Sequence, residues 1–414
     1  RDADTCYNIG IGQSAGKSLN EGDDNVMIGV CAGHALTSGS KNTFLGLRAG
    51  SYRASGDRNI ALGYLAGYGA NTGDYNIAIG QETLGNPGNG EHNIALGRKA
   101  AEKLTDGDHN FFVGHQAGKC VTTGSKNVII GCYAAGEGVS AITGGNNFIV
   151  GTGAAEKITS GSNNLIFGRN AASNGVLTGC YNVAFGFESG CALTSGTYHI
   201  FIGKYAGKGT ETGQDNIFLG RYSGCLTSTG SYNVAIGANT MIGNGTKTGN
   251  TALGRFAGCA ITAAQYNTFL GYGAGHHTTT GCYNIAIGCA VCLSANDANT
   301  ELAIGCGTSR WICGDGNFNV GIGTNPADAV GSATTSKLSV GILSAYQLYG
   351  DGSNLTGAGF APDDEGNLVA GTDAGAAKDA DTLCNVMIGM GAGKALNAGD
   401  CNVFLGMCAG QSET

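Results

Sequence analysis

A five-residue pattern recurs along the whole chain: an asparagine, three mostly apolar residues and a glycine. Clear examples are Asn25 to Gly29 and Asn42 to Gly46. The glycine returns every 17 residues with few exceptions, in nineteen repeats up to residue 323 and in three more near the end of the chain. The apolar triplets are rich in β-branched and aromatic residues, which favour short strands. Because 17 residues are too few for a helical-hairpin repeat, the period predicts an all-β fold, a parallel β-solenoid or β-roll of 17-residue coils.

The period divides the chain into three parts. Residues 1–323 are expected to form a shaft of nineteen coils, stacked in parallel about 4.8 Å apart. Residues 324–366 break the period and contain two of the three prolines, so an irregular joint or small knob is expected there. The repeats resume over residues 367–414, where Lys378 to Thr382 is similar to Arg1 to Thr5, 377 residues earlier. The last part is therefore interpreted as the start of a further super-repeat.

Asparagine fills the column four residues before the glycine in twenty of twenty-two repeats, the exceptions being His199 and Glu301. Stacked amides can hydrogen-bond along the axis of a solenoid, or cap a turn while tolerating left-handed dihedral angles. Glycine suits sharp corners and the close approach of two backbones. The pattern therefore predicts a structural ladder rather than a catalytic site. Its members include Asn25, Asn42, Asn59, Asn76 and Asn93, with Gly29, Gly46 and Gly63 in the glycine column.

The apolar triplet of each repeat predicts how the chain associates. Side chains of a strand alternate between its two faces, so the first and third positions, such as Val26 and Ile28, are expected to fill the coil's own interior. The middle position then points the other way, yet it is non-polar in every repeat. We expect this second face to meet other copies of the chain, in a homotrimer closed around one axis. The residues assigned to this inter-chain face are Met27, Phe44, Phe112, Phe201, Phe218, Phe269 and Phe404.

Composition narrows the function classes. Of 414 residues, 76 are glycine and 3 are proline, and 13 % are charged against roughly 25 % in ordinary globular domains. This bias favours a repeat architecture over an enzyme of average design. Proline is too rare for collagen, and the 42 % apolar content is too high for a disordered linker. The net charge of −8 is spread without long runs, and no apolar stretch approaches the roughly 20 residues of a membrane span, so neither nucleic-acid binding nor membrane insertion is predicted.

Sixteen cysteines allow two interpretations. Several recur in stacked columns, among them Cys289 with Cys306 and Cys384 with Cys401, which leaves cross-links between coils or chains open. The favoured alternative is that the thiols are small, partly apolar fillers.

Metal, cofactor and catalytic sites are not predicted. His276 and His277 stand near Cys259 and Cys282 in the coil register, but zinc takes four ligands in tetrahedral geometry, and no pair of CxxC motifs with zinc spacing is present. The glycine-rich clusters lack the strand-and-helix context of nucleotide-binding loops, and no Ser-His-Asp or paired-carboxylate set is found. We therefore expect no metal, no cofactor and no enzymatic activity.

The coils resemble the N-x-x-x-G repeats of phage tail-fibre and related viral appendage proteins, and more loosely the head repeats of trimeric autotransporter adhesins. A second motif runs from Asn319 to Thr324 and continues in Ser336 to Val340 and Gly350 to Gly357. It looks like the segment found ahead of the self-cleaving intramolecular chaperone of endosialidase-type fibres. These resemblances imply a trimeric fibre that serves attachment to a host.

The function expected from the sequence is that of a non-catalytic structural shaft in an extended extracellular or virion fibre. Its partners would be further copies of itself, in a homotrimer and end to end, and a cell-surface receptor or glycan bound by a region outside these residues. The alternative is a cell-surface adhesin or extracellular filament of similar build. An ice-binding solenoid is less favoured, because the threonine column that includes Thr37, Thr105 and Thr122 is interrupted by Ala54 and Glu211.

Overall fold

The computed structural model describes residues 6–69, 72–86, 88–138, 140–315, 320–322, 338–340, 366–377, 383–396 and 399–411. The chain divides into two compact units, residues 1–342 and 343–414. The described residues of both units form short strands and turns, and the predicted all-β parallel β-solenoid is confirmed. Within this described part, no helix has the length and apolar character that a membrane span requires.

The first unit is built on one long sheet of three-residue strands that recur once per coil. These strands are β1 (Ile9–Ile11), β2 (Val26–Ile28), β3 (Thr43–Leu45), β4 (Ile60–Leu62), β5 (Ile77–Ile79), β6 (Ile94–Leu96), β7 (Phe111–Val113), β8 (Val128–Ile130), β9 (Phe148–Val150), β10 (Leu165–Phe167), β11 (Val183–Phe185), β12 (Ile200–Ile202), β13 (Ile217–Leu219), β14 (Val234–Ile236), β15 (Thr251–Leu253) and β16 (Thr268–Leu270). Two five-residue strands follow, β17 (Ile285–Cys289) and β18 (Leu302–Cys306).

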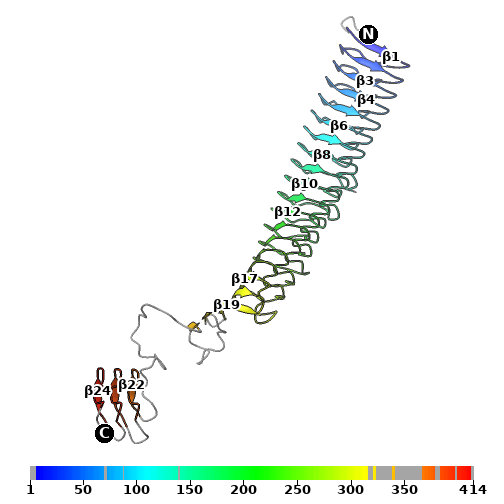
Figure 1. The fold of residues 1–414 in the computed structure, drawn as a ribbon. Helices are drawn as coiled ribbons and strands as arrows, with labels where there is room; N and C mark the ends of the chain where they lie inside the picture. The colour runs from blue at the N-terminus through cyan, green and yellow to red at the C-terminus, as the bar shows by residue number, and fades with distance from the viewer. Residues whose placement is uncertain are drawn as a thin grey trace. The chain divides into compact units, whose positions relative to one another are not determined.

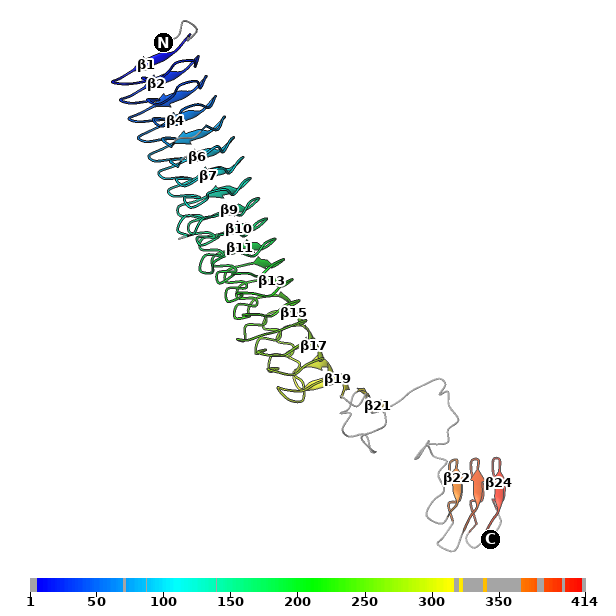
Figure 2. The same cartoon turned by 180° about the vertical axis from the view of Figure 1, so that it is seen from behind.

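Each strand from β1 to β18 pairs in parallel with the next, and the pairing keeps strict register from coil to coil. The middle residue of β2, Met27, lies beside Phe44 of β3, for example, and Phe201 of β12 lies beside Phe218 of β13. The strands form one row along one side of the stack, and the turn segments run along the other (Figure 1). Seen from behind, the same single row of strands continues in chain order (Figure 2). Every residue column of the repeat is therefore also a column in space.

The glycine that ends each strand is required by both conformation and space. Gly29 has φ of 136°, and a Cβ placed on it would lie 2.3 Å from the carbonyl oxygen of Gly46 in the next coil. Gly46 and Gly63 share this arrangement, with φ of 133° and 131°. A residue with a side chain would be strained in its backbone and would push two coils apart. The predicted glycine column is thus present for the predicted reason.

The prediction of which side chains face inward is wrong. The middle residue of each triplet fills the interior of its own coil: Phe44, Phe112, Phe201, Phe218 and Phe269 are fully buried in the single chain, and Met27 is 2 % exposed. Phe404 of the second unit is half-buried and packs against that unit's core. The first and third residues face out, as Phe185 (48 % exposed) and Ile202 (42 % exposed) illustrate. The seven residues assigned to an inter-chain face therefore belong to the core of the coil.

The asparagine before each triplet is the physical reason for this orientation. Its side chain lies inside the coil, where Asn25, Asn42 and Asn59 are 2 % exposed or less. Because side chains alternate along a strand, the next residue must point out, the middle one in and the third out. Large middle side chains are accommodated by a second glycine column, since a Cβ on Gly50 would lie 2.8 Å from the ring of Phe44.

The parallel stack ends differently from the prediction. Where a nineteenth coil ending at residue 323 was expected, β18 pairs antiparallel with β19 (Ser309–Gly314), and β19 pairs antiparallel with β20 (Val320–Ile322). β20 then pairs in parallel with β21 (Leu338–Val340). The predicted joint of residues 324–366 lies outside the described residues, apart from 338–340 and 366. The hairpin covers the edge of β18, which would otherwise present unpaired backbone groups.

The second unit repeats the architecture on a small scale. Strands β22 (Leu368–Ala370), β23 (Val386–Ile388) and β24 (Val403–Leu405) pair in parallel and in register. Asn385 donates from its backbone and its amide to Oδ1 of Asn367 at 2.9 and 3.0 Å, as in the ladder of the first unit. The repeat predicted for residues 367–414 therefore forms coils in its described part.

Candidate functional site

The asparagine column is a continuous ladder of hydrogen bonds along the interior of the stack. Oδ1 of Asn25 accepts from the backbone N–H of Asn42 at 2.9 Å and from its Nδ2 at 3.0 Å. Nδ2 of Asn42 also donates across the coil to the carbonyl of Gly56 at 2.9 Å. Asn42 in turn accepts the same two bonds from Asn59. Each amide is thereby satisfied without water, which explains how so polar a column can be buried.

The ladder continues through Asn76 and Asn93, both of which donate to the asparagine of the preceding coil. It also survives a change of period. The interval between Gly131 and Gly151 is 20 residues, yet Asn147 donates to Oδ1 of Asn127 at 3.0 and 3.1 Å. The extra residues are therefore taken up in the turns, and the predicted ladder serves as the structural axis of the coil.

His199 replaces asparagine in one rung and weakens it. Its backbone N–H donates to Oδ1 of Asn182 at 3.0 Å, and its Nδ1 accepts from the backbone N–H of Asn216 at 3.2 Å. Nε2, the protonated nitrogen of this tautomer, is buried without a hydrogen-bond partner, while the ring stacks on Phe201 at 4.9 Å. Burial away from water lowers the pKa of His199 from its ordinary value of 6.5 to about 4.

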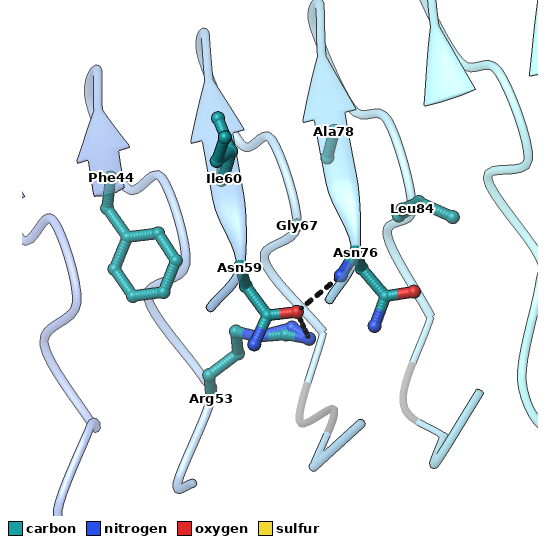
Figure 3. Close-up of a pocket in the computed structure, with 9 residues that line it drawn as sticks. Phe44, Arg53, Asn59, Ile60, Gly67, Asn76, Ala78 and Leu84 are labelled. Carbon is teal, nitrogen blue, oxygen red and sulfur yellow. Dashed lines mark hydrogen bonds between the residues drawn. The ribbon is translucent and has the colours of Figure 1, made fainter. Parts of the chain in front are cut away.

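Arg53 is a buried cation beside the ladder, and Figure 3 shows its guanidinium group reaching toward Asn59. Nη2 donates to Oδ1 of Asn59 at 3.3 Å and to the carbonyl of Gly73 at 3.1 Å, whereas Nε has no partner. Loss of hydration lowers the pKa of Arg53 to about 10, although Asp74 opposes this shift. The neighbouring coils have Leu19 and Leu36 in the equivalent position, so Arg53 is an interruption of the apolar core.

A small cavity lies next to Arg53, between Phe44 and Leu84 (Figure 3). It exists because Ala61 and Ala78 stand where other coils place a large middle side chain. The space measures about 10 Å³, which is at the lower limit of what one water molecule needs. The cavity is therefore a packing defect, and it is too small to hold a substrate.

Lys247 is a second buried cation, at a corner where the preceding coils have Gly213 and Gly230. Its Nζ donates to Oγ1 of Thr227 at 2.9 Å, to the carbonyl of Met241 at 3.0 Å and to the carbonyl of Gly243. Desolvation lowers the pKa of Lys247 to about 8. All three donors are used within the coil, so the residue serves the local fold.

The outward side chains of β1 to β18 form a surface that we call the outer face, defined as the first and third residues of each triplet. These positions hold Ile, Val, Leu or Phe in every strand except for the three threonines Thr43, Thr251 and Thr268. No charged residue occurs among them. Each strand from β1 to β18 therefore contributes at least one apolar side chain to the outer face. The sequence correctly indicates that both faces of the strand are apolar. The residues predicted to lie on the outside, however, are the middle residues of the triplets, which point inward.

The column two residues before each strand borders the outer face and has left-handed backbone conformation. It is aromatic in some coils and charged in others, as in Asp24, Lys41, Arg58 and Lys126. Tyr75 stacks on His92 at 4.8 Å and His92 on His109 at 4.9 Å. Further along, Tyr181 and Tyr198 stack at 5.2 Å. The φ angles of these five aromatic residues lie between 56° and 61°. These aromatic stacks were not predicted, although the tyrosines and histidines at this position recur in the sequence.

None of the cysteines that the structure describes is in a disulfide bond. Cys289 and Cys306 are register partners in β17 and β18, and both are exposed. Cys384 and Cys401 are likewise exposed and occupy the same column of adjacent coils. Buried thiols, such as Cys191 and Cys225 in the first unit, have a pKa raised by desolvation. That environment suits the predicted role of small fillers.

Within the part of the chain that the structure describes, one group of three metal-ligating side chains comes together. The ligand atoms of His276, His277 and Cys292 lie within 4.8 Å of one another. The sequence placed the two histidines near Cys259 and Cys282, neither of which belongs to this group.

No protein-family model matches the chain, and no curated protein matches it in sequence.

Proposed function

We propose that this chain is the non-catalytic structural shaft of an extended extracellular or virion fibre, and that its copies associate side by side through the outer face. The observation that carries the proposal is the apolar character of that face from β1 to β18.

The size of the outer face supports association. Eighteen strands spaced about 4.8 Å apart extend over roughly 80 Å, and three residues of strand are about 10 Å wide, which gives an area of about 800 Å². A soluble monomer exposes apolar patches of roughly 300–600 Å² at most, whereas a stable interface buries about 800 Å² on each partner. The face is thus as large as one side of a stable interface.

A second copy of the chain is the partner that fits this face best. Its own outer face has the same length and the same repeat along the axis, so ridges of one copy recur at the spacing of the grooves of the other. Neither face carries a charge that association would have to desolvate. Three copies arranged around one axis would cover all three faces at once, which is why we propose a homotrimer.

The ladders suit a stiff shaft. Besides the asparagines, the threonine column donates hydroxyl hydrogen bonds to backbone carbonyls of the next coil, as from Thr194 to Glu211 at 2.7 Å and from Thr262 to Thr279 at 3.2 Å. These hydroxyls already hold neighbouring coils together. An ice-binding face would need them in a free, regular array, so this observation disfavours the ice-binding alternative.

The test introduces a charge on the outer face. In the variant Ile202→Asp combined with Leu219→Asp, two carboxylates lie where copies would meet, and we expect gel filtration with light scattering to show dissociation to single chains. Leu226→Asp is the matched control, because Leu226 is 48 % exposed but lies in a turn away from the outer face. Circular dichroism should show that all variants keep the fold. If the double variant retains the oligomeric mass of the parent chain, the outer face is not the interface.

A further inference from the structure

We propose that His276, His277 and Cys292 form a binding site for a transition-metal ion of the Zn²⁺ type. The proposal is independent of the shaft function, since it concerns two coils near the end of the parallel stack.

The geometry is close to that of a bound ion. The ligand atoms of the three residues lie within 4.8 Å of one another, and the two imidazole rings are 4.0 Å apart at their centroids. Bond lengths of about 2.0 Å to nitrogen and 2.3 Å to sulfur at tetrahedral angles place the ligand atoms about 3.5 Å apart. An ion would draw the ligand atoms together from at most 4.8 Å to about this separation, and the exposed side chain of His277 has space in which to move.

A backbone carbonyl already orients the first histidine. Nδ1 of His276 lies 2.7 Å from the carbonyl oxygen of Gly273, a distance at which the neutral ring donates its N–H. Carbonyl groups hold metal-ligating histidines in the same manner and keep Nε2 free as a ligand. The backbone around His276 therefore does not have to rearrange for the ring to bind an ion through Nε2.

Cys292 departs from the repeat in which it stands. Cys292 occupies the position four residues after Gly288, where the two preceding coils have glycine, Gly258 and Gly275. The following repeat carries Glu301 in place of the ladder asparagine. Its backbone N–H still donates to Oδ1 of Asn284 at 2.8 Å, but its side chain bonds Ser294 instead of continuing the ladder. The side-chain ladder of this stack therefore stops at Glu301, directly after the coil that supplies the cysteine.

An ion at this site would join two successive coils. His276 and His277 belong to the turn after β16, and Cys292 belongs to the turn after β17. Two imidazoles and one thiolate form a donor set for Zn²⁺ or Co²⁺ rather than for Mg²⁺ or Ca²⁺, which prefer oxygen. Because His277 is exposed, the fourth position is open to water. The chemical consequence is a cross-link at the end of the parallel stack, where the ladder gives way to the β18–β19 hairpin.

The experiment is a titration of the metal-stripped chain with Co²⁺, followed by absorption spectroscopy. We expect one ion per chain, with visible bands typical of four-coordinate cobalt and a thiolate-to-cobalt charge-transfer band in the near ultraviolet. Cys292→Ser should remove the charge-transfer band and weaken binding at least tenfold, and His277→Asn should weaken binding by 10- to 100-fold. His277 is exposed, so its substitution tests the site even if the cysteine variant fails to fold.

The matched control is Cys282→Ser, a partly buried thiol ten residues earlier that lies outside the group. It should bind Co²⁺ with the affinity and spectrum of the parent chain.

In hydrogen-exchange measurements, Zn²⁺ should slow exchange of the amides in residues 289–301 of the parent and leave the His277→Asn variant unchanged. The assignment is overturned if Cys292→Ser keeps the charge-transfer band, or if Cys282→Ser loses it.

Discussion

At the scale of single residues, the position where histidine replaces the ladder asparagine shows which hydrogen-bonding groups the ladder needs. Asparagine offers an acceptor oxygen and an amide nitrogen with two N–H donors on a short side chain, and the ladder uses the oxygen and both N–H groups. His199 accepts through Nδ1 but points its remaining N–H at no partner. Only one of the two ring nitrogens of His199 has a hydrogen-bond partner, so replacing this residue with asparagine should raise the stability of the folded chain.

We expect His199→Asn to stabilise the chain and to remove a pH dependence. The folded pKa of about 4 lies below the unfolded value of 6.5. As pH falls through this window, the unfolded chain takes up a proton that the folded chain refuses, so stability is lost with acid. The full shift corresponds to about 3 kcal/mol. Urea denaturation of parent and variant between pH 7 and pH 4 measures it, with Tyr198→Asn, an exposed neighbour, as control. Parallel pH profiles for parent and His199→Asn would contradict this account.

An internal asparagine should be far more costly to remove. In Asn127→Ala, the backbone N–H and Nδ2 of Asn147 lose their acceptor, and the carbonyl of Gly144 loses its donor. Unsatisfied buried groups cost about 1–3 kcal/mol each, so a loss of about 3 kcal/mol or more in local stability is expected. Hydrogen exchange of the amides in the flanking coils is the measurement. Asn174→Ala, at an exposed turn position, should change protection by less than about 0.5 kcal/mol. Equal effects from the two variants would show that the ladder is not a stabilising element.

At the scale of the coil, the sequence predicts the period, the strand and the two main columns correctly because each follows from a local rule. A 17-residue spacing sets one coil per repeat, and glycine recurs wherever positive φ and backbone contact coincide. The inward face could not be chosen from hydrophobicity, since both faces of the strand are apolar. The asparagine settles the choice: a polar side chain repeated every coil needs partners inside, and alternation then fixes the phase of the triplet.

The corrected orientation changes what a mutation of the middle column should do. Phe218 stacks on Phe201 at 5.2 Å and lies against Gly224, where a Cβ would approach its ring to 2.4 Å. Phe218→Ala should therefore lower the local unfolding free energy by about 3–5 kcal/mol, seen as faster amide exchange in its own and adjacent coils. Phe185→Ala, on the outer face, should leave those amides much less affected. A Phe218→Ala chain that keeps its amide protection but loses its oligomeric state would restore the inter-chain assignment.

The end of the stack could not be predicted from the period alone. Gly323 continues the spacing of the repeat, which suggested another coil. The structure instead turns back after Cys306, through Gly307 with φ of 58°, and β19 runs antiparallel to β18. Competition between a parallel coil and an antiparallel hairpin depends on long-range pairing energy, which no local pattern in the sequence encodes. The metal-ligating group near this end escaped prediction for the same reason, since Cys292 joins the two histidines only when coils stack.

At the scale of the whole molecule, the account depends on one face of one sheet. The interior of the coil buries its own large side chains and pairs the amides of its asparagine ladder, with a few exceptions such as Nε2 of His199 and Nε of Arg53. These exceptions are buried inside single coils, where a second copy of the chain would not reach them. The outer face is the part of the coil that would gain from a partner, because its apolar side chains remain in contact with water along the sheet. The proposed side-by-side association rests on this imbalance, and the proposed shaft function rests on the association.

The most direct measurement is the mass of the purified chain in solution, by sedimentation equilibrium over a wide range of concentrations. The account predicts a mass of about 124 kDa, three times the 41.4 kDa of one chain, that persists on dilution. A compact, soluble species of 41.4 kDa at all concentrations would contradict it, since the outer face would then be stable in water without a partner.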